Sequence, residues 1–382
     1  MLNQKNRLKR LAAGAAAVLL ALGLAACGQS QSNNAQSSAA SPAAESSQAE
    51  SSQAESSSEA QSASASGAEE VEHATAVQND YQGTTVRIGS LKGPTTMGLV
   101  NMMEAGEIGA LPFDATFTMG TTPDEITAKI VSGDVDIALI PANLASVLYN
   151  KTNGGIEVMN INTLGVLYGV TGDSSVTSLQ DLAGKTVYMT GQGATPEYAF
   201  NYILEQNGLK DKVQVEFKSE ATEIAALMKE DPTKIAILPQ PFATVVEMQN
   251  DGVKEFMNLT DEWAKCKDSG DSQLVTAVTV VRKEFADAHK DDGLLSEFLA
   301  QQEKSTEQAN QEIDTTAELV AKYGIIEKAP VAKIALPKCG IVCLTDEEMK
   351  SALTGYLEVL FNADAKSVGG TLPGDDFYLL GV

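Results

Sequence analysis

The chain has 382 residues, of which 27 are Lys or Arg and 51 are Asp or Glu, so its formal net charge is −24 at pH 7. No basic patch remains beyond the N-terminal segment, and nucleic acid is therefore not an expected partner. The sequence contains only two histidines, His73 and His289, which argues against Ser–His or Cys–His catalysis and against a His-bearing zinc site, so we expect no cofactor and no metal.

The first 26 residues have the three parts of a secretory signal peptide: a basic start, an apolar run over 11–22 and a segment of small residues. The apolar run is shorter than the roughly 20 residues that a transmembrane helix needs. The sequence Leu24-Ala25-Ala26-Cys27 resembles the bacterial lipoprotein lipobox. This resemblance implies cleavage before Cys27, lipidation of its sulfur and anchoring in the lipid bilayer, because each inserted methylene contributes about 0.8 kcal/mol. The alternative is a plain secretory signal with an incidental cysteine.

Residues 27–80 consist mainly of Ser, Ala, Gln and Glu, and Val71 and Val77 are their only large apolar side chains. Such a segment cannot offset the entropy of ordering, so we expect a disordered tether with a reach of roughly 40 Å. A tether of this kind fits a protein held on the outer surface of a Gram-positive cell.

The remaining ~300 residues are long enough for two lobes, and their pattern predicts an α/β fold in which strands alternate with helices. In the first half, apolar runs predict strands over 85–90, 115–119, 135–140 and two more within 156–170. Helices are expected over 97–104, from 123 to about 131, and from 141 to about 151.

A second lobe is expected from residue 168, with strands over 185–189, 213–217 and 235–238 and helices after 195 and over 221–228. The run 274–281 predicts a strand that returns to the first lobe, followed by helices between 284 and 322 and over 346–362. Lobe 1 should therefore comprise 84–167 and 275–382, and lobe 2 should comprise 168–274. Two crossings between lobes would permit hinge closure over a ligand.

Four strand-to-helix turns stand out, around 91–100, 141–146, 190–198 and 239–244. We expect Thr95 or Thr96 to cap the first helix, and Thr195 to cap the helix that Pro196 begins. Each turn lies at the carboxyl end of a strand, where open α/β sheets bind ligands.

Several segments carry a family resemblance. They are Gly93–Gly98, the Gly-Asp-Val-Asp-Ile-Ala run at 133–138, the Asp-Leu-Ala-Gly-Lys-Thr-Val run at 181–187 and the tail 367–378. From about residue 84 to the end, the chain resembles the substrate-binding lipoproteins of ABC importers, in the nitrate/sulfonate/taurine and thiamine-precursor group. The resemblance implies a two-lobed, type II periplasmic-binding-protein-like fold with a hinge. It also implies a monomer that delivers a small molecule to a membrane permease.

By position in that fold, four groups of residues would bind the ligand in the cleft, with Tyr168 near the hinge. The groups are Lys92, Gly93, Pro94, Thr95, Thr96 and Met97; Pro141, Ala142 and Asn143; Gly191, Gln192, Gly193, Ala194 and Thr195; and Gln240 with Pro241. These loops contain no arginine and no tryptophan, and Lys92 is either a ligand contact or a solvated cation. A small, neutral or weakly charged ligand is therefore favoured over a sulfonate.

Other conspicuous residues have structural interpretations. Alternation puts Asp134 and Asp136 on one face at the start of a strand, away from its carboxyl end, so we expect them to serve a turn and the lobe surface rather than catalysis. Trp263 lies in a charged helix and is expected to pack at the surface. The methionines at 97, 102 and 103 are expected to fill the core, because Met is a common gap-filler.

Three cysteines remain after Cys27, so a full disulfide framework is excluded. Cys339 and Cys343 could close a small disulfide loop if Gly340 folds the chain back, because an extended strand would hold their Cα atoms too far apart. Two thiols are the alternative, and the sequence leaves both open.

The predicted function is capture of a small molecule for an ABC importer by a lipid-anchored, extracytoplasmic protein that is not an enzyme. One alternative is a sensory or adhesive surface lipoprotein. Another is an enzyme on the same fold, similar to menaquinone-pathway dehydratase/lyase or thiamine-pyrimidine synthase relatives. Those enzymes are cytosolic, so the export signal argues against them, and the second group depends on histidine and metal chemistry that this sequence lacks.

Overall fold

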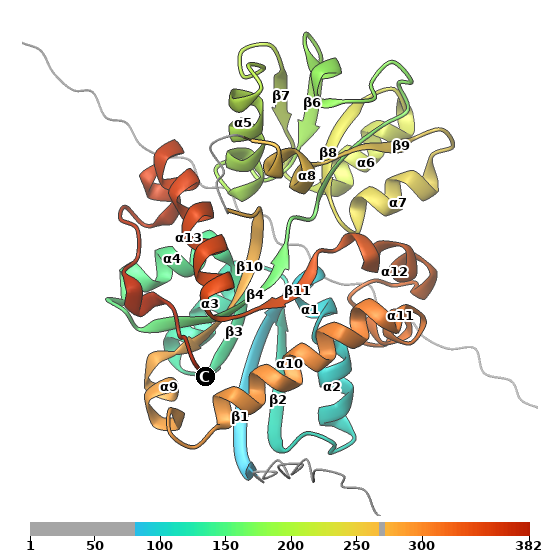
Figure 1. Ribbon diagram of the computed structural model, residues 1–382. Coiled ribbons are helices and arrows are strands. Elements are labelled where there is room, and N and C mark those ends of the chain that lie inside the picture. The colour runs from blue at the N-terminus through green and yellow to red at the C-terminus, as the bar shows by residue number, and fades with distance from the viewer. Residues whose placement is uncertain (1–80, 267–271) are drawn as a thin grey trace, which may run out of the picture. The chain divides into compact units, whose positions relative to one another are not determined.

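The computed structural model describes residues 81–266 and 272–382 (Figure 1), all within one compact unit, Ala74–Val382. The predicted signal peptide, Cys27 and the tether over 27–80 lie outside the described residues and stay predictions. No helix in the described part of the chain is long and apolar enough to cross a bilayer.

Lobe 1 is built on a six-stranded sheet in the order β11-β4-β10-β3-β1-β2. β1 pairs in parallel with β2 and β3, whereas β10 pairs antiparallel with β3 and β4, and β11 antiparallel with β4. The strands are β1 (Tyr81–Leu91), β2 (Phe113–Gly120), β3 (Ile137–Pro141), β4 (Ile156–Leu164), β10 (Val275–Arg282) and β11 (Ile341–Leu344).

Lobe 2 is built on a five-stranded sheet in the order β7-β6-β8-β5-β9. β6 pairs in parallel with β7 and β8, and β5 pairs antiparallel with β8 and β9. The strands are β5 (Leu167–Thr171), β6 (Thr186–Met189), β7 (Gln214–Phe217), β8 (Ile235–Pro239) and β9 (Lys254–Asn258). The two-lobed α/β architecture expected from the sequence is thus confirmed, while the exact lobe bounds remain a prediction.

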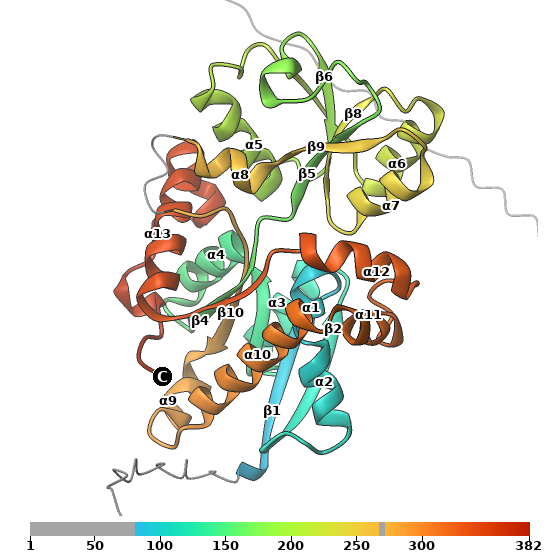
Figure 2. The same cartoon turned by 45° about the vertical axis from the view of Figure 1, so that its right-hand side comes forward.

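Helices cover both faces of each sheet (Figures 1 and 2). In lobe 1 they are α1 (Pro94–Met97), α2 (Val100–Glu107), α3 (Pro123–Ser132), α4 (Ala142–Thr152), α9 (Lys283–His289), α10 (Leu294–Gln311), α11 (Ile313–Lys322), α12 (Ala329–Ala335), α13 (Asp346–Ala363) and the 3-10 turns η2 (Leu336–Lys338), η3 (Ala365–Val368) and η4 (Asp375–Phe377). In lobe 2 they are α5 (Thr195–Gln206), α6 (Ala221–Glu230), α7 (Phe242–Gln249), α8 (Leu259–Ala264) and the 3-10 turn η1 (Leu179–Leu182).

One hydrophobic core runs without interruption from lobe 1 into lobe 2. It joins apolar residues of α3, α4 and α13 to those of α5 and α8. Separate cores lie on the far side of each sheet: α2, α10 and α11 cover one in lobe 1, and α6 and α7 cover the other in lobe 2. The lobes therefore share packing on one side of the molecule.

Trp263 lies in the shared core, so its predicted surface position is wrong. Its side chain is 1% exposed, and its ring lies 4.7 Å from that of Tyr202 and 5.8 Å from that of Tyr356. The indole Nε1 donates to Ser272 Oγ at 3.1 Å. The acidic residues that made α8 read as a surface helix occupy its other face, and one helix can present both.

The first helix of lobe 1 differs from the one expected over 97–104. The chain forms two short helices, α1 and α2, and the N-cap of α1 is Gly93, whose φ of 137° favours glycine. Thr95 and Thr96 do not cap this helix. Their hydroxyls donate instead to the carbonyl oxygen of Leu91, the last residue of β1.

The helix expected from residue 123 is confirmed as α3, with Thr122 and Glu125 forming a reciprocal capping box. The predicted core positions of the methionines at 97, 102 and 103 are also confirmed, because all three are buried. The elements α12, β9 and β11 were not anticipated; each is seven residues or shorter.

Cys339 and Cys343 are separate thiols, which settles the alternative that the sequence left open. The chain enters strand β11 immediately after Gly340, so the two side chains are not folded back onto each other. Burial raises the pKa of both thiols to about 12, which keeps them protonated and poorly reactive at neutral pH.

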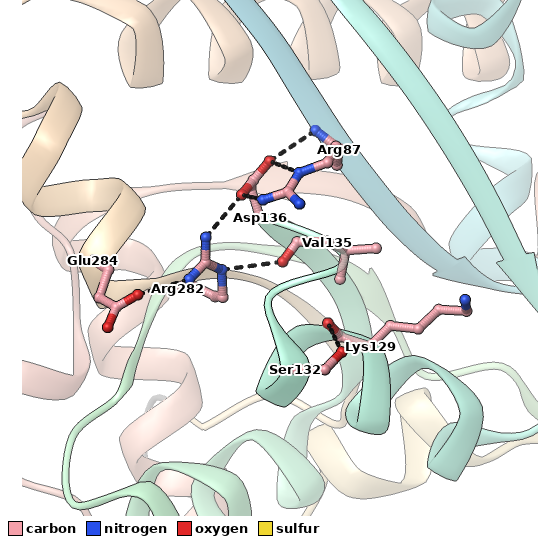
Figure 3. A network of polar contacts seen from close by, with 7 residues as sticks. All are labelled: Arg87, Lys129, Ser132, Val135, Asp136, Arg282 and Glu284. Carbon is pink, nitrogen blue, oxygen red and sulfur yellow. Dashed lines mark hydrogen bonds and ion pairs between the residues drawn. The ribbon is translucent and has the colours of Figure 1, made fainter.

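Asp136 is buried, so its predicted place at the lobe surface is wrong; only its neighbour Asp134 is exposed. Its carboxylate accepts hydrogen bonds from Arg87 Nε at 2.8 Å and from Arg282 Nη2 at 3.0 Å (Figure 3). The backbone adds Asp136 N to Arg87 O at 2.7 Å and Arg282 N to Asp136 O at 2.9 Å. Burial by itself raises the pKa of Asp136, but the two guanidinium groups outweigh it and lower that pKa.

We expect Asp136→Asn to lower the free energy of unfolding by about 3 kcal/mol, because it leaves two guanidinium groups without their shared carboxylate. Asp134→Asn is the matched control: that side chain is exposed, and the change should stay within about 0.5 kcal/mol. Urea unfolding at pH 7 measures both variants. Equal stability of the two would show that the buried cluster contributes nothing.

The contacts of Asp136 with Arg87 and Arg282 also predict that the stability of the fold depends on pH. Because the folded-state pKa of Asp136 lies below its ordinary value of 3.8, its contribution is complete above that value and disappears as the pH falls through the folded-state pKa. The stability difference between the wild type and Asp136→Asn should therefore be constant from pH 7 to 5 and shrink below pH ~4. A difference that grows on acidification would contradict this assignment.

Candidate ligand-binding cavity between the lobes

A cavity of about 540 Å³ lies between the two lobes, within the size range of small-molecule sites. Its walls come from the carboxyl ends of β1, β3 and β8, from the helix starts that follow strands, and from the crossing segments. The lining residues are Leu91, Lys92, Gly93, Pro94, Thr95, Pro123, Asp124, Pro141, Asn143, Leu144, Val166, Leu167, Ala194, Thr195, Pro196, Pro239, Gln240, Pro241, Phe242, Thr276 and Ala277.

All four predicted turns contribute to this lining. The predicted site residues that line it are Lys92, Gly93, Pro94, Thr95, Pro141, Asn143, Ala194, Thr195, Gln240 and Pro241. The structure thus brings together segments that are up to about 150 residues apart in the chain, because the carboxyl ends of strands from both sheets meet at one cleft.

The other predicted site residues lie outside the lining. Thr96, Met97 and Ala142 are fully buried, because these positions of the helices face the sheet. Gly191, Gln192 and Gly193 form the outer part of their turn, where Gly193 N donates to Glu197 Oε2 at 2.5 Å. Tyr168 is buried, and its hydroxyl donates to the Lys338 carbonyl oxygen at 2.9 Å.

Sequence reasoning missed several lining residues. Pro123 and Asp124 begin α3 after strand β2. This turn has a threonine followed by proline, as the predicted turn at Thr195 and Pro196 does, so the sequence could have identified it. Phe242 directly follows the predicted Gln240-Pro241 pair. Val166, Leu167, Thr276 and Ala277 belong to the segments that cross between lobes, and no local pattern distinguishes them from other strand residues.

The cavity wall is rich in proline. Six of the twelve prolines in the chain line it: Pro94, Pro123, Pro141, Pro196, Pro239 and Pro241. Proline at a helix start suits the fixed φ of its ring but contributes no N–H group. The helices α1, α3, α4, α5 and α7 all begin at the cavity, yet they present fewer donors there than ordinary helix starts would.

Charged groups are scarce at the cavity. Among the described residues that line it, Lys92 and Asp124 are the only ionisable ones, and both are exposed. Their charges are opposite, so the lining carries no formal net charge. In the described ranges 81–266 and 272–382, no cluster of three or more His, Cys, Asp or Glu side chains is placed to hold a metal ion.

Gln240 is a buried polar residue of the wall, 2% exposed; Thr95, the other buried polar residue of the described lining, uses its hydroxyl to donate to Leu91 O. Gln240 Oε1 accepts from the Thr244 hydroxyl at 2.8 Å and from Thr244 N at 3.4 Å, and its backbone N donates to Val166 O at 2.9 Å. Its Nε2 has no hydrogen-bond partner anywhere in the described part of the chain. The amide thus has a fixed acceptor end and an unused donor end.

A hydrogen-bonded chain joins the lobes on one side of the cavity. Thr195 Oγ1, at the start of α5, donates to Asn143 Oδ1 at 3.3 Å and accepts from the Tyr356 hydroxyl at 3.1 Å. Thr195 is therefore not the N-cap of α5, as predicted from the sequence; Ala194 holds that position. Its side chain serves a contact between lobes, which no local rule anticipates.

An ion-pair cluster joins the lobes on the other side. Lys338 Nζ, from η2 in lobe 1, lies 3.2 Å from Glu247 Oε2 and 2.9 Å from Glu255 Oε2 in lobe 2. Burial lowers the pKa of Lys338, but the hydrogen bonds to both carboxylates outweigh this effect and raise that pKa. The ion pairs of Lys338 and the hydrogen bond from the Tyr168 hydroxyl to Lys338 O together hold η2 against lobe 2.

We expect Lys338→Met to lower the free energy of unfolding by about 1 kcal/mol, because the partly exposed pairs lose their shared cation. It should also increase the radius of gyration, since the lobes lose the ion pairs that join them on this side. Lys333→Met, which removes an exposed pair with Asp314 from the neighbouring helix α12, is the control and should change neither quantity. Urea unfolding and small-angle X-ray scattering decide; identical behaviour of the two variants would contradict the role of Lys338.

The sequence model of a family described as "Menaquinone biosynthesis" matches residues 94–353. No protein with a curated description is significantly similar to the chain in sequence.

Solved structures share the fold at low identity. An ABC transporter protein from Parabacteroides distasonis is 20% identical with a TM-score of 0.67, covering 78% of this chain and 99% of that one. The periplasmic aliphatic sulphonate-binding protein SsuA from Escherichia coli is 15% identical with a TM-score of 0.60, covering 77% and 96%. The ligand-binding component of an ABC-type import system from Staphylococcus aureus, solved with zinc bound, is 16% identical with a TM-score of 0.57, covering 78% and 97%.

These likenesses extend over almost the whole of the related structures, and the family match covers the strands and helices that surround the cavity. The chain therefore belongs to the family described as "Menaquinone biosynthesis" and has the periplasmic-binding-protein fold.

Proposed function

We propose that this protein is an extracytoplasmic solute-binding lipoprotein that captures a small molecule between its lobes and delivers it to the permease of an ABC importer. The observation that carries the proposal is the cavity of about 540 Å³, walled by both lobes at the carboxyl ends of their strands. The similar structures from Parabacteroides distasonis, Escherichia coli and Staphylococcus aureus support it, because their descriptions name transport or ligand binding.

In this proposal, capture depends on the equilibrium between an open and a closed arrangement of the two lobes. The Thr195 and Lys338 contacts hold lobe 2 against lobe 1 on both sides of the cavity. A ligand that touches both walls adds contacts only to the closed form, and therefore shifts the population of open and closed forms toward closure. The permease would recognise the closed form, and the ligand would leave chemically unchanged.

The location follows from the N-terminal sequence. In the proposal, the signal directs export, Cys27 carries the lipid anchor and the tether over 27–80 holds the lobes away from the membrane as a monomer. A Gram-positive cell surface fits this arrangement.

An enzyme is the second candidate, favoured by the description of the matching family as "Menaquinone biosynthesis". The cavity supports it less well. Lys92 and Asp124, the ionisable residues found in the described lining, are both exposed, whereas a general acid or base is usually tuned by burial or by a charged neighbour. A sensory or adhesive lipoprotein would use the same cavity without a permease.

A thermal-shift screen of small metabolites tests solute binding. At 100 times its dissociation constant, a ligand adds about 2.7 kcal/mol, or a rise in Tm of about 4 °C for a domain of this size. Ala194→Trp, which fills the cavity from the start of α5, should abolish the shift. Ala183→Trp, at an exposed position of the same lobe outside the lining, should retain it. A shift that survives Ala194→Trp would place binding elsewhere.

Mass spectrometry of the compound recovered after overnight incubation separates the two functions. The binding proposal predicts an unchanged mass and one equivalent recovered per protein chain. A new product that accumulates beyond one equivalent, and that Ala194→Trp no longer forms, would favour the enzyme.

The lipid anchor has its own test in cells that carry the full-length gene. Cys27→Ser should release the protein from the membrane fraction, because the anchoring sulfur is lost. Cys343→Ser removes a half-buried thiol outside the proposed lipid-attachment site and should leave the protein in the membrane fraction. Retention of the Cys27→Ser protein would favour another mode of attachment.

A further inference from the structure

The chemistry of the cavity wall limits the ligands it can accept. Its surface is formed largely by proline rings and by the side chains of Leu91, Leu144, Val166 and Phe242. Burying apolar ligand surface against such a wall is favourable in proportion to the area removed from water. A ligand with a substantial hydrocarbon body therefore fits better than a small inorganic ion.

A permanently charged ligand would lose its hydration without adequate compensation. The described lining offers Lys92 as its one cation, and that side chain is exposed and accompanied by Asp124. A buried charge needs a partner and hydrogen bonds to offset the loss of water. Because Lys92 and Asp124 are both exposed, neither supplies a buried charge with a desolvated partner.

Side chains of the protein itself accept backbone hydrogen bonds at or just before three of the five helix starts that border the cavity. The Glu125 carboxylate accepts from Thr121 N at 2.8 Å before α3, and Glu197 accepts from Gly193 N before α5. At α7, Gln240 Oε1 accepts from Thr244 N. Two of these acceptors are carboxylates, which compensate the positive end of the helix dipole and weaken its attraction for a ligand anion.

Gln240 supplies the remaining specific contact. The two bonds from Thr244 assign the acceptor end of the amide, so the other end must be the NH₂ donor. This donor is buried, belongs to a residue that lines the cavity and has no partner in residues 81–266 and 272–382. Leaving such a donor unpaired is costly, so an acceptor on the ligand gains both its own hydrogen bond and the relief of that cost.

We propose that the ligand is an uncharged, mainly apolar molecule that presents a carbonyl-type acceptor to Gln240 Nε2. This inference rests on the proposed solute-binding function and names its ligand class. Gln240 then distinguishes ligands that carry the acceptor from hydrocarbons of the same shape, and the apolar wall distinguishes uncharged ligands from sulfonates and carboxylates.

A matched series of four probes on one hydrocarbon body tests the class by titration calorimetry: 4-tert-butylbenzamide, 4-tert-butylbenzoate, 4-tert-butylbenzenesulfonate and 4-tert-butyltoluene. The amide should bind the wild type most tightly, at least about 10-fold more tightly than either anion, because only the anions lose charge hydration.

Two variants of Gln240 isolate the donor. Gln240→Met should weaken binding of the amide by about 10-fold and leave that of the toluene derivative within about twofold, since only the amide uses the hydrogen bond. Gln240→Glu keeps the acceptor for Thr244 and the shape of the side chain, so it tests the same loss if the Met variant folds poorly. Gln180→Met, at an exposed glutamine of lobe 2, is the control and should bind all four probes as the wild type does.

The class is overturned if either anion binds more tightly than the amide, if none of the four probes binds, or if both Gln240 variants keep the wild-type affinity for the amide. These results leave solute binding intact whenever the metabolite screen still finds a ligand that Ala194→Trp excludes. Failure of that screen would instead remove solute binding itself.

Discussion

The buried carboxylate of Asp136 organises lobe 1. It lies just before β3 and accepts hydrogen bonds from Arg87 on β1 and Arg282 on β10, while backbone bonds join the same three residues. These strands are neighbours in the sheet, so one ionic cluster fixes their register at the end opposite the cavity. With that register fixed, Leu91 and Pro141 reach the cavity wall together.

The way the two lobes are joined limits how they can move. The shared core passes through Trp263 and Tyr356 on one side, whereas Lys338 joins two carboxylates of lobe 2 on the other. Separating apolar surfaces requires free energy in proportion to the area exposed to water, whereas breaking a partly exposed ion pair requires little. The cleft should therefore open on the Lys338 side and hinge on the Trp263 side.

The helix starts around the cavity are modified by proline and by nearby carboxylates. Five helix starts surround the cavity, an arrangement that would suit an anion if their N–H groups were free. Prolines at these starts and the carboxylates of Glu125 and Glu197 remove much of that capacity. The lining is mainly apolar, and its residue Gln240 carries a buried donor, Nε2, that has no partner among the described residues.

The sequence alone determined the α/β class, the two-lobed fold and the four turns that meet at the cavity, because strand and helix periodicity and turn residues are local properties. It also identified Gln240 and Pro241 as cleft residues. It misplaced Asp136 and Trp263, since a charged neighbourhood in the sequence does not reveal that Arg282 or Tyr356 lies opposite. It also assigned Thr195 to a cap, whereas the tertiary structure uses its hydroxyl between lobes. Burial and the partner of a polar group depend on residues far away in the chain, and only the folded arrangement of both lobes decided them.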